Sequence, residues 1–269
     1  MPDSCELRHL YVWDRLVLQL APGLTNSRHR HFGAFLLLAP DAPIKIDVEG
    51  SPRIIAQAAL IAPGTWHGLD SRSSRVATLL LGADHPWFGY IAPALDGSAV
   101  VPLDLRRLTG RVDWNEWFNG NHDCEAMLAF LQRTLAAVTT LPFAPHVLDP
   151  QVAEAVRILN AAPENTSGLT SLVRRVGLSD VTLMRRFKRE LGVRVREYAL
   201  WRRLMNVLPL IDGRRTLTEI AQLAGFYDQA HLTRTSRRMF DLQPSRVAGF
   251  SRARIHVCTR LQHTRNSTR

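Results

Sequence analysis

The sequence predicts an α+β protein with a β-rich N-terminal half and an all-helical C-terminal third. Up to about residue 105, short apolar runs are separated by Gly, Pro and Asp, which is typical of closely spaced strands in a small barrel or sandwich. After Trp114, apolar residues recur at spacings of three and four, which is the period of helices. The strand-like pattern therefore gives way to a helical one before the middle of the chain.

Charge is divided unevenly between the two halves. Residues 1–150 carry 12 Lys and Arg against 15 Asp and Glu, whereas residues 151–269 carry 22 against 9. A strongly basic half joined to a slightly acidic one suggests two tasks, and a polyanion is the natural partner of the basic half.

The expected strands are bounded by turn clusters such as Ala-Pro-Asp-Ala-Pro at 39–43 and Glu-Gly-Ser-Pro at 49–52. The apolar runs that we assign to strands are 16–20, 32–38, 44–48, 54–61, 76–81 and 99–103. In 124–138 an apolar stripe then indicates one face of a helix. Its members are Met127, Phe130, Leu131, Leu135 and Val138. A linker at 141–146 and a helix at 150–160 follow, and 161–168 is expected to be a loop.

The first of two similar basic units begins at Leu169. Its first helix buries Leu169, Leu172, Val173 and Val176, and Gly177 supplies the turn that follows. Ser179 is a good N-cap for a second helix at about 180–191. Two helices joined by such a turn form a helix-turn-helix, in which the second helix enters the major groove of DNA.

The second unit repeats this arrangement about 48 residues later. Thr216 and Glu219 form a capping box at the start of its first helix, and Gly225 supplies the turn. Asp228 is placed to cap a second recognition helix at about 228–240. A helix over 195–210, with Trp201 in its core, would span about 24 Å and hold the two recognition helices near the ~34 Å repeat of B-DNA.

Residues at many fixed positions in 168–250 resemble the DNA-binding domain of the AraC/XylS family of bacterial transcription regulators. The residues that carry the resemblance include Val176, Gly177, Leu183, Phe187, Gly192, Tyr198, Ile220, Ala221, Gly225, Phe226, Gln229, Leu232 and Arg234. The resemblance implies seven helices, with two helix-turn-helix units bridged by a long helix, and asymmetric DNA sites. Ser236 departs from it, because the family usually has Phe at this inward position, and Pro209 removes a backbone donor late in the bridging helix.

The residues expected to contact DNA are exposed on the two recognition helices. Arg and Gln suit bidentate bonds to guanine and adenine, and small or apolar side chains suit thymine methyl groups. The first helix contributes Val181, Thr182, Met184, Arg185 and Lys188; the second contributes Gln229, Ala230, Thr233, Arg234 and Arg237. Lys188, Arg189, Arg237 and Arg238 are better placed for phosphates.

Three histidines in the N-terminal half resemble the motif regions of a cupin barrel, a fold common among AraC-type sensor domains. His29 and His31 form a His-x-His pair, and His67 follows Trp66 in the second region. We expect His29, His31, Trp66 and His67 to bind a small-molecule ligand, but they could instead be ordinary residues at the mouth of the barrel. Three imidazoles could also bind a metal ion, but no Glu follows His31 at the cupin spacing, so we assign no metal.

Four segments follow from these patterns. They are a cupin-like sensor domain at 1–110, a helical dimerisation and linker segment at 111–164, a DNA-binding domain at 165–255 and a disordered basic tail at 256–269. The dimerisation role is implied by the resemblance of 124–138 to the helix through which family members dimerise. If that role is wrong, the stripe is buried against its own barrel.

The leading hypothesis is a transcription regulator that binds double-stranded DNA as a homodimer, responds to a small molecule and contacts RNA polymerase. Two alternatives remain open: a metal-dependent cupin enzyme fused to a DNA-binding domain, or a ligand-independent regulator that acts through partner proteins. We expect no catalytic residues and no cofactor. Three widely spaced cysteines predict no disulfide framework. The absence of a signal-peptide core and of any long apolar run predicts a cytoplasmic protein without a membrane partner.

Overall fold

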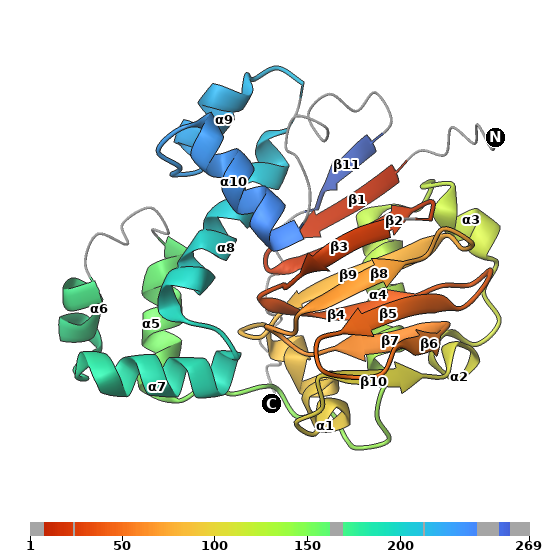
Figure 1. Cartoon of the computed structure of the whole chain (residues 1–269), viewed down its shortest axis with the longest axis horizontal. Coiled ribbons are helices and arrows are strands. Elements are labelled where there is room, and N and C mark those ends of the chain that lie inside the picture. Colours follow the sequence, from red (N-terminus) through yellow and green to blue (C-terminus); the bar gives the residue numbers. More distant parts are fainter. Residues whose placement is uncertain (1–7, 24, 162–168, 212, 241–252, 259–269) are drawn as a thin grey trace, which may run out of the picture.

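The computed structural model describes residues 8–23, 25–161, 169–211, 213–240 and 253–258. A β-rich N-terminal part lies beside a helical C-terminal part (Figure 1), so the predicted α+β class is confirmed. None of the helices in the described part of the chain combines the length and apolar character needed to cross a lipid bilayer.

The N-terminal part contains two sheets. The larger has the strand order β10-β7-β4-β9-β2-β1-β11, and the smaller has the order β3-β8-β5-β6. The strands of the larger sheet are β1 (Arg8–Trp13), β2 (Leu16–Ala21), β4 (Gly33–Leu38), β7 (Ala58–Ile61), β9 (Val76–Gly82), β10 (Val100–Leu103) and β11 (Ala253–Val257). Those of the smaller sheet are β3 (Thr25–His29), β5 (Ile44–Val48), β6 (Ile54–Ala56) and β8 (His67–Asp70).

Burial explains why the central strands have uninterrupted apolar sequences. Every residue of β4 and β9 is buried. The smaller sheet lies over one face of the larger sheet, and α4 (Cys124–Ala136) crosses the other (Figure 1). A strand that is covered on both faces has no polar side, so it lacks the alternation of a half-exposed strand.

The stripe of α4 is buried within its own chain. Its five members are between 0% and 7% exposed: Met127, Phe130, Leu131, Leu135 and Val138. The alternative, in which the stripe is buried against its own barrel, describes these side chains, because they pack in the hydrophobic core of the same molecule. Dimerisation through the 111–164 segment stays a prediction. A periodic apolar face shows that a helix must bury one side. It does not show which part of the molecule, or which partner, covers that side.

The helical part has the two expected helix-turn-helix units. Its helices are α5 (Pro150–Ala161), α6 (Leu169–Val176), α7 (Asp180–Leu191), α8 (Val195–Val207), the 3-10 helix η2 (Leu208–Leu210), α9 (Leu217–Leu223) and α10 (Gln229–Phe240). Gly177 and Gly225, in the two turns, have φ values of 70° and 79°, which glycine adopts without strain. The bridging helix becomes a 3-10 turn at Pro209, consistent with the backbone donor that proline lacks.

Short helices connect the sheets to α4. They are the 3-10 helix η1 (Pro86–Tyr90), α1 (Ala92–Leu95), α2 (Leu105–Thr109) and α3 (Trp114–Phe118).

The C-terminal segment returns to the N-terminal sheet, which the sequence did not suggest. Residues 253–257, expected to end the DNA-binding domain and begin a disordered tail, form β11 and pair in parallel with β1. Residues 259–269 of the expected tail lie outside the described residues. The prediction of no disulfide framework misses one bond, because β11 brings Cys258 beside α4, where it forms a disulfide with Cys124. This pairing depends on a strand contact across the whole chain, so cysteine spacing gave no sign of it.

Loss of this disulfide should destabilise the protein measurably. The bond spans 134 residues of sequence, and a cross-link of that span removes much chain entropy from the unfolded state. We expect Cys258→Ser to lower the free energy of unfolding in urea by about 2–4 kcal/mol under oxidising conditions. Cys5→Ser, which leaves the bond intact, is the matched control, and equal stability of the two variants would contradict the pairing.

Candidate nucleic-acid interface and histidine site

The first helix-turn-helix unit exposes the side chains expected to contact DNA. In α7, Val181 is 71% exposed and Met184 is 45% exposed, although both are apolar. Arg185 and Lys188 are exposed on the same helix, and Thr182 is half-buried. The opposite face packs into the core through the buried residues Leu183, Phe187 and Leu191. The helix begins at the expected cap, since the Ser179 hydroxyl accepts a hydrogen bond from the Thr182 backbone N–H at 3.3 Å.

The second unit has the same arrangement. On α10, the side chains of Gln229, Ala230, Arg234 and Arg237 are exposed and that of Thr233 is half-buried. Leu232 faces inward and is fully buried. Both sequence-predicted caps are present: Thr216 and Glu219 form the capping box of α9, and the Asp228 carboxylate accepts a hydrogen bond from the His231 N–H at 2.6 Å.

A polar contact across the second turn orients one of these side chains. The Thr218 hydroxyl lies 3.3 Å from Oε1 of Gln229, to which it donates a hydrogen bond. This bond limits the rotamers of an otherwise exposed glutamine, and less side-chain entropy is then lost when that residue binds. Ser236, at the inward position that departs from the AraC/XylS resemblance, is buried at 6% exposure.

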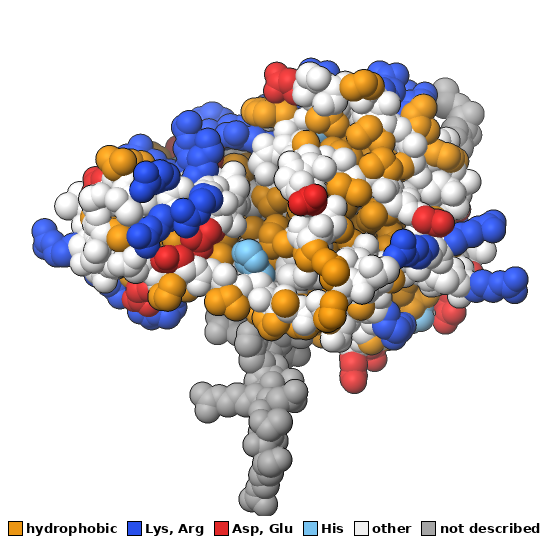
Figure 2. All heavy atoms as spheres, turned by 90° about the horizontal axis from the view of Figure 1, so that it is seen from below, with side chains coloured by type: hydrophobic (Ala, Val, Ile, Leu, Met, Phe, Trp, Pro, Cys, Tyr) orange, Lys and Arg blue, Asp and Glu red, His pale blue; other side chains and the backbone are white. Residues whose placement is uncertain are grey.

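Basic side chains gather on the helical part. Figure 2 shows Lys and Arg over the helices at the left, with a second group at the far end of the β-rich part. Some of them are neutralised within the chain: Arg186 pairs with Asp149 at 3.1 Å, and Arg189 pairs with Glu190 at 3.1 Å. Arg185 and Arg234 make no ion pair with any residue in the described ranges. Their charge therefore remains available to an external anion.

Three of the four residues predicted to bind a ligand lie together in the β-rich part. His29 at the end of β3 pairs across the strands with His67 at the start of β8, and His31 follows in the crossing from the smaller to the larger sheet. All three are buried, and their nearest ring nitrogens lie within 4.8 Å of one another. Trp66 lies apart, because its ring is 40% exposed and faces the Arg30 guanidinium at 5.3 Å.

Backbone carbonyls fix the orientation of two of these imidazoles. Nδ1 of His29 lies 2.7 Å from the Ser27 carbonyl, and Nδ1 of His67 lies 3.0 Å from the Thr65 carbonyl. Because a carbonyl oxygen can only accept, each Nδ1 carries the proton and each neutral ring directs an Nε2 lone pair into the cluster. The Nε2 of His29 faces that of His31 at 2.8 Å.

Burial keeps His31 and His67 neutral. It lowers the pKa of His67 to about 4, against a smaller opposing effect of the Thr65 carbonyl. The pKa of His31 lies well below its ordinary value, first because the ring is buried and then because His29 and His67 are close. Neutral imidazole is the form of histidine that binds metals.

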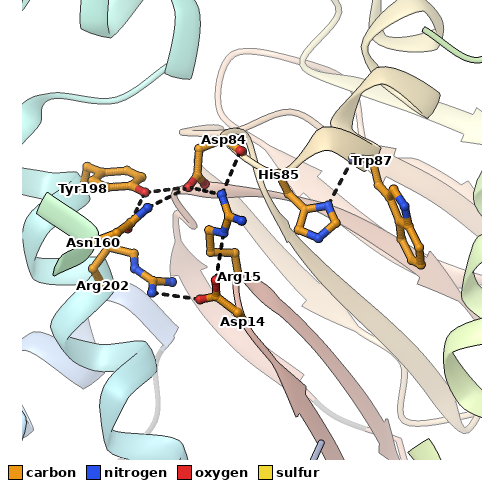
Figure 3. A network of polar contacts seen from close by, with 8 residues as sticks. All are labelled: Asp14, Arg15, Asp84, His85, Trp87, Asn160, Tyr198 and Arg202. Carbon is orange, nitrogen blue, oxygen red and sulfur yellow. Dashed lines mark hydrogen bonds and ion pairs between the residues drawn. The ribbon is translucent and has the colours of Figure 1, made fainter. Parts of the chain in front are cut away.

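A buried polar network that sequence reasoning missed joins the β-rich part to the helices (Figure 3). Asp84, whose side chain is fully buried, pairs with Arg15 at 3.2 Å. From the other side, the Tyr198 hydroxyl donates to Asp84 at 2.7 Å and lies 2.9 Å from Oδ1 of Asn160. The sequence gave no signal for it, because Asp84 and Tyr198 are separated by 114 residues.

Two neighbouring ion pairs extend the same junction. Arg202 of α8 pairs with Asp14 at 3.0 Å, and Arg30 pairs with Glu197 at the start of α8. Burial first, and then the Asp84 charge, raises the pKa of Tyr198 well above its ordinary value, so its hydroxyl remains a donor at all moderate pH values.

The fold thus defines the class of protein, which has a β-rich part docked on two helix-turn-helix units. Residues 172–249 match the model of a family described as a helix-turn-helix domain. The chain therefore carries a helix-turn-helix domain over these residues. None of the curated proteins matches the chain.

Solved structures share the overall fold. An apo structure of a single-residue variant of ToxT from Vibrio cholerae superimposes with a TM-score of 0.63 at 11% identity, covering 87% of this chain and 97% of that one. Wild-type ToxT of the same organism with a bound unsaturated fatty acid gives a TM-score of 0.58 at 12% identity, covering 87% and 94%. A transcriptional regulator of Chromobacterium violaceum with an AraC-type DNA-binding domain is 28% identical over 37% of this chain and 90% of that chain, with a TM-score of 0.35. At these identities the likeness to ToxT shows the fold.

The Asp84 network should contribute to the docking of the two parts. Tyr198→Phe removes the hydroxyl that donates to a buried carboxylate, so we expect the free energy of unfolding to fall by about 1.5–3 kcal/mol. Urea denaturation measures this, with Tyr227→Phe as the control, since Tyr227 is 89% exposed. A loss no larger than that of the control would show that the network does not stabilise the junction.

Proposed function

We propose that this protein is a sequence-specific transcription regulator that binds double-stranded DNA through α7 and α10. The observation that carries this proposal is the presence of two capped helix-turn-helix units, each exposing arginine and apolar side chains on its second helix. Exposed Val181 and Met184 have no evident role on a solvated surface, but both suit contact with thymine methyl groups.

Different side chains have different roles in this proposal. Arg185, Gln229 and Arg234 form hydrogen bonds with base edges, and Ala230 and Thr233 contact methyl groups. Lys188 and Arg237 hold phosphates and so set the position of the protein without reading the sequence. The helices occupy successive major grooves, one pitch of the duplex apart.

The N-terminal part is, in this proposal, a cupin-like sensor domain that binds a small molecule. ToxT has the same fold and binds an unsaturated fatty acid in one structure and a naphthalenyl butenoic acid in another. These ligands support a small-molecule effector here without naming it. An effector that prefers one arrangement of the two parts would shift DNA occupancy by its difference in affinity for the two arrangements.

We assign no catalytic residue in this function and place the protein in the cytoplasm with its DNA. RNA polymerase contact and homodimer formation remain predictions. A dimer would have to use a surface other than the α4 stripe, because those side chains are buried.

Arg234→Ala tests base recognition directly. Loss of a bidentate contact should weaken binding to the selected site by about 1–3 kcal/mol and relax specificity at one base position. The measurement is a titration of fluorescent duplex whose sequence is selected from random DNA with the wild-type protein. Thr170→Ala, at an exposed position on α6 outside the proposed contacts, is the control. If Arg234→Ala loses as much affinity for scrambled DNA as for the selected site, Arg234 is a phosphate contact and does not read a base.

Arg237→Ala tests the phosphate role by its salt dependence. Each neutralised phosphate contributes about 0.9 to the slope of log K against log salt concentration. We expect this variant to lose affinity equally on selected and scrambled duplexes and to reduce the slope by about 1. An unchanged slope would remove Arg237 from the interface, and no salt dependence in the wild type would contradict DNA binding by the basic part.

A further inference from the structure

We infer that His29, His31 and His67 together bind one divalent transition-metal ion, and that the occupied site holds α10 in place and so raises DNA affinity. The regulatory half of this inference rests on the proposed DNA-binding function. The metal site itself stands on the side-chain geometry alone.

The donor set is suited to such an ion. In the described part of the chain, these three histidines are the one group of His, Cys, Asp or Glu whose ligand atoms converge in this way. Three imidazoles with no carboxylate or thiolate favour zinc, nickel, copper or iron over magnesium and calcium. Three protein ligands also leave a fourth position for water or an external ligand.

An unsatisfied atom indicates that the cluster is incomplete without a ligand. Nε2 of His67 is buried and has no hydrogen-bond partner in the structure, and the Thr65 carbonyl holds the ring so that this atom faces the cluster. A buried acceptor in this state is costly. The carbonyl bonds to Nδ1 of His29 and His67 are also the outer-shell contacts that orient histidines on a metal.

The cluster is directly connected to the second recognition helix. α10 packs against β3, which ends at His29, and His31 follows two residues later. A metal held by His29 and His31 would fix the position of the segment that ends β3, and α10 packs against that strand. Occupancy therefore strengthens a contact between the β-rich part and α10.

Two further contacts link the same loops to the first unit. The Gly64 N–H donates to the His31 carbonyl at 2.8 Å, and a Cβ placed on Gly64 would lie 3.2 Å from the carbonyl oxygen of Gly192, at the end of α7. Arg30, between two of the ligands, pairs with Glu197 at the start of α8. Ordering the histidine loops thus restrains the ends of three helices of the DNA-binding part.

The direction of the effect follows from exposure. Gln229 and Arg234 remain exposed while the last turn of α10 is docked on the β-rich part, so the docked arrangement leaves the DNA-facing side of α10 open. A metal that stabilises this arrangement lowers the conformational entropy that α10 loses when the protein binds DNA. By linkage, DNA must tighten metal binding by the same factor.

The test uses the full chain, stripped with chelator and then titrated with Zn²⁺ alone. We expect one equivalent of zinc per chain, and a Co²⁺ visible spectrum typical of nitrogen ligation. His67→Ala should bind zinc at least about a hundredfold less tightly, since loss of an outer-shell contact already costs up to that factor. His146→Ala, which removes a histidine outside the cluster, should bind zinc as the wild type does.

Duplex titrations with and without Zn²⁺ then test the coupling. We expect zinc to lower the Kd for the selected duplex by about 5- to 50-fold in the wild type and in His146→Ala, and to have no effect in His67→Ala. Failure of the wild type to bind stoichiometric zinc, with DNA binding intact, overturns the metal site and leaves the proposed function standing. Stoichiometric zinc with unchanged DNA affinity overturns the coupling. Absence of DNA binding in every condition defeats the proposed function, whatever the zinc stoichiometry.

Discussion

The arrangement of the molecule depends on a carboxylate shared across the junction between its two parts. Asp84 belongs to the β-rich part, its side chain is fully buried, and it receives Arg15 from its own part and Tyr198 from the bridging helix. Such a pair contributes little net stability, because its attraction is largely offset by the loss of hydration. Removal of one partner nevertheless costs about 3–5 kcal/mol, because a buried charge is then left alone. The network therefore acts mainly on orientation, since Oδ2 of Asp84 receives the Tyr198 hydroxyl only when α8 is seated correctly.

Orientation matters because α8 connects both helix-turn-helix units. Its N-terminal end receives Arg30 from the histidine loops, and its buried face carries Tyr198 and Trp201. A displacement of α8 relative to the sheets would move both recognition helices together. The return of the chain through β11, with the disulfide at its end, adds a second attachment of the helical part to the larger sheet. A signal in the β-rich part thus has several short physical routes to the DNA-facing helices.

Local patterns were sufficient for the DNA-binding part. The turns at Gly177 and Gly225, the caps at Ser179, Thr216 and Asp228, and the helical periods between them all depend on residues within a few positions of one another. The strands at the centre of the larger sheet were likewise recognisable as apolar runs. Four other strands, β1, β3, β8 and β11, were not assigned, because short or half-polar strands acquire their character from the neighbours with which they pair.

The sequence by itself determined that two basic helix-turn-helix units follow a β-rich domain, and that His29, His31 and His67 are the residues of interest in that domain. Those features are encoded by spacing along the chain. Tertiary structure decided what the α4 stripe packs against, that Cys124 meets Cys258, and that Asp84 meets Tyr198. It also decided that the three imidazoles converge while Trp66 lies apart. Each of these is a contact between segments that are distant in the sequence. An apolar stripe or a single buried polar residue shows that a partner is needed, but the sequence does not show which residue that partner is.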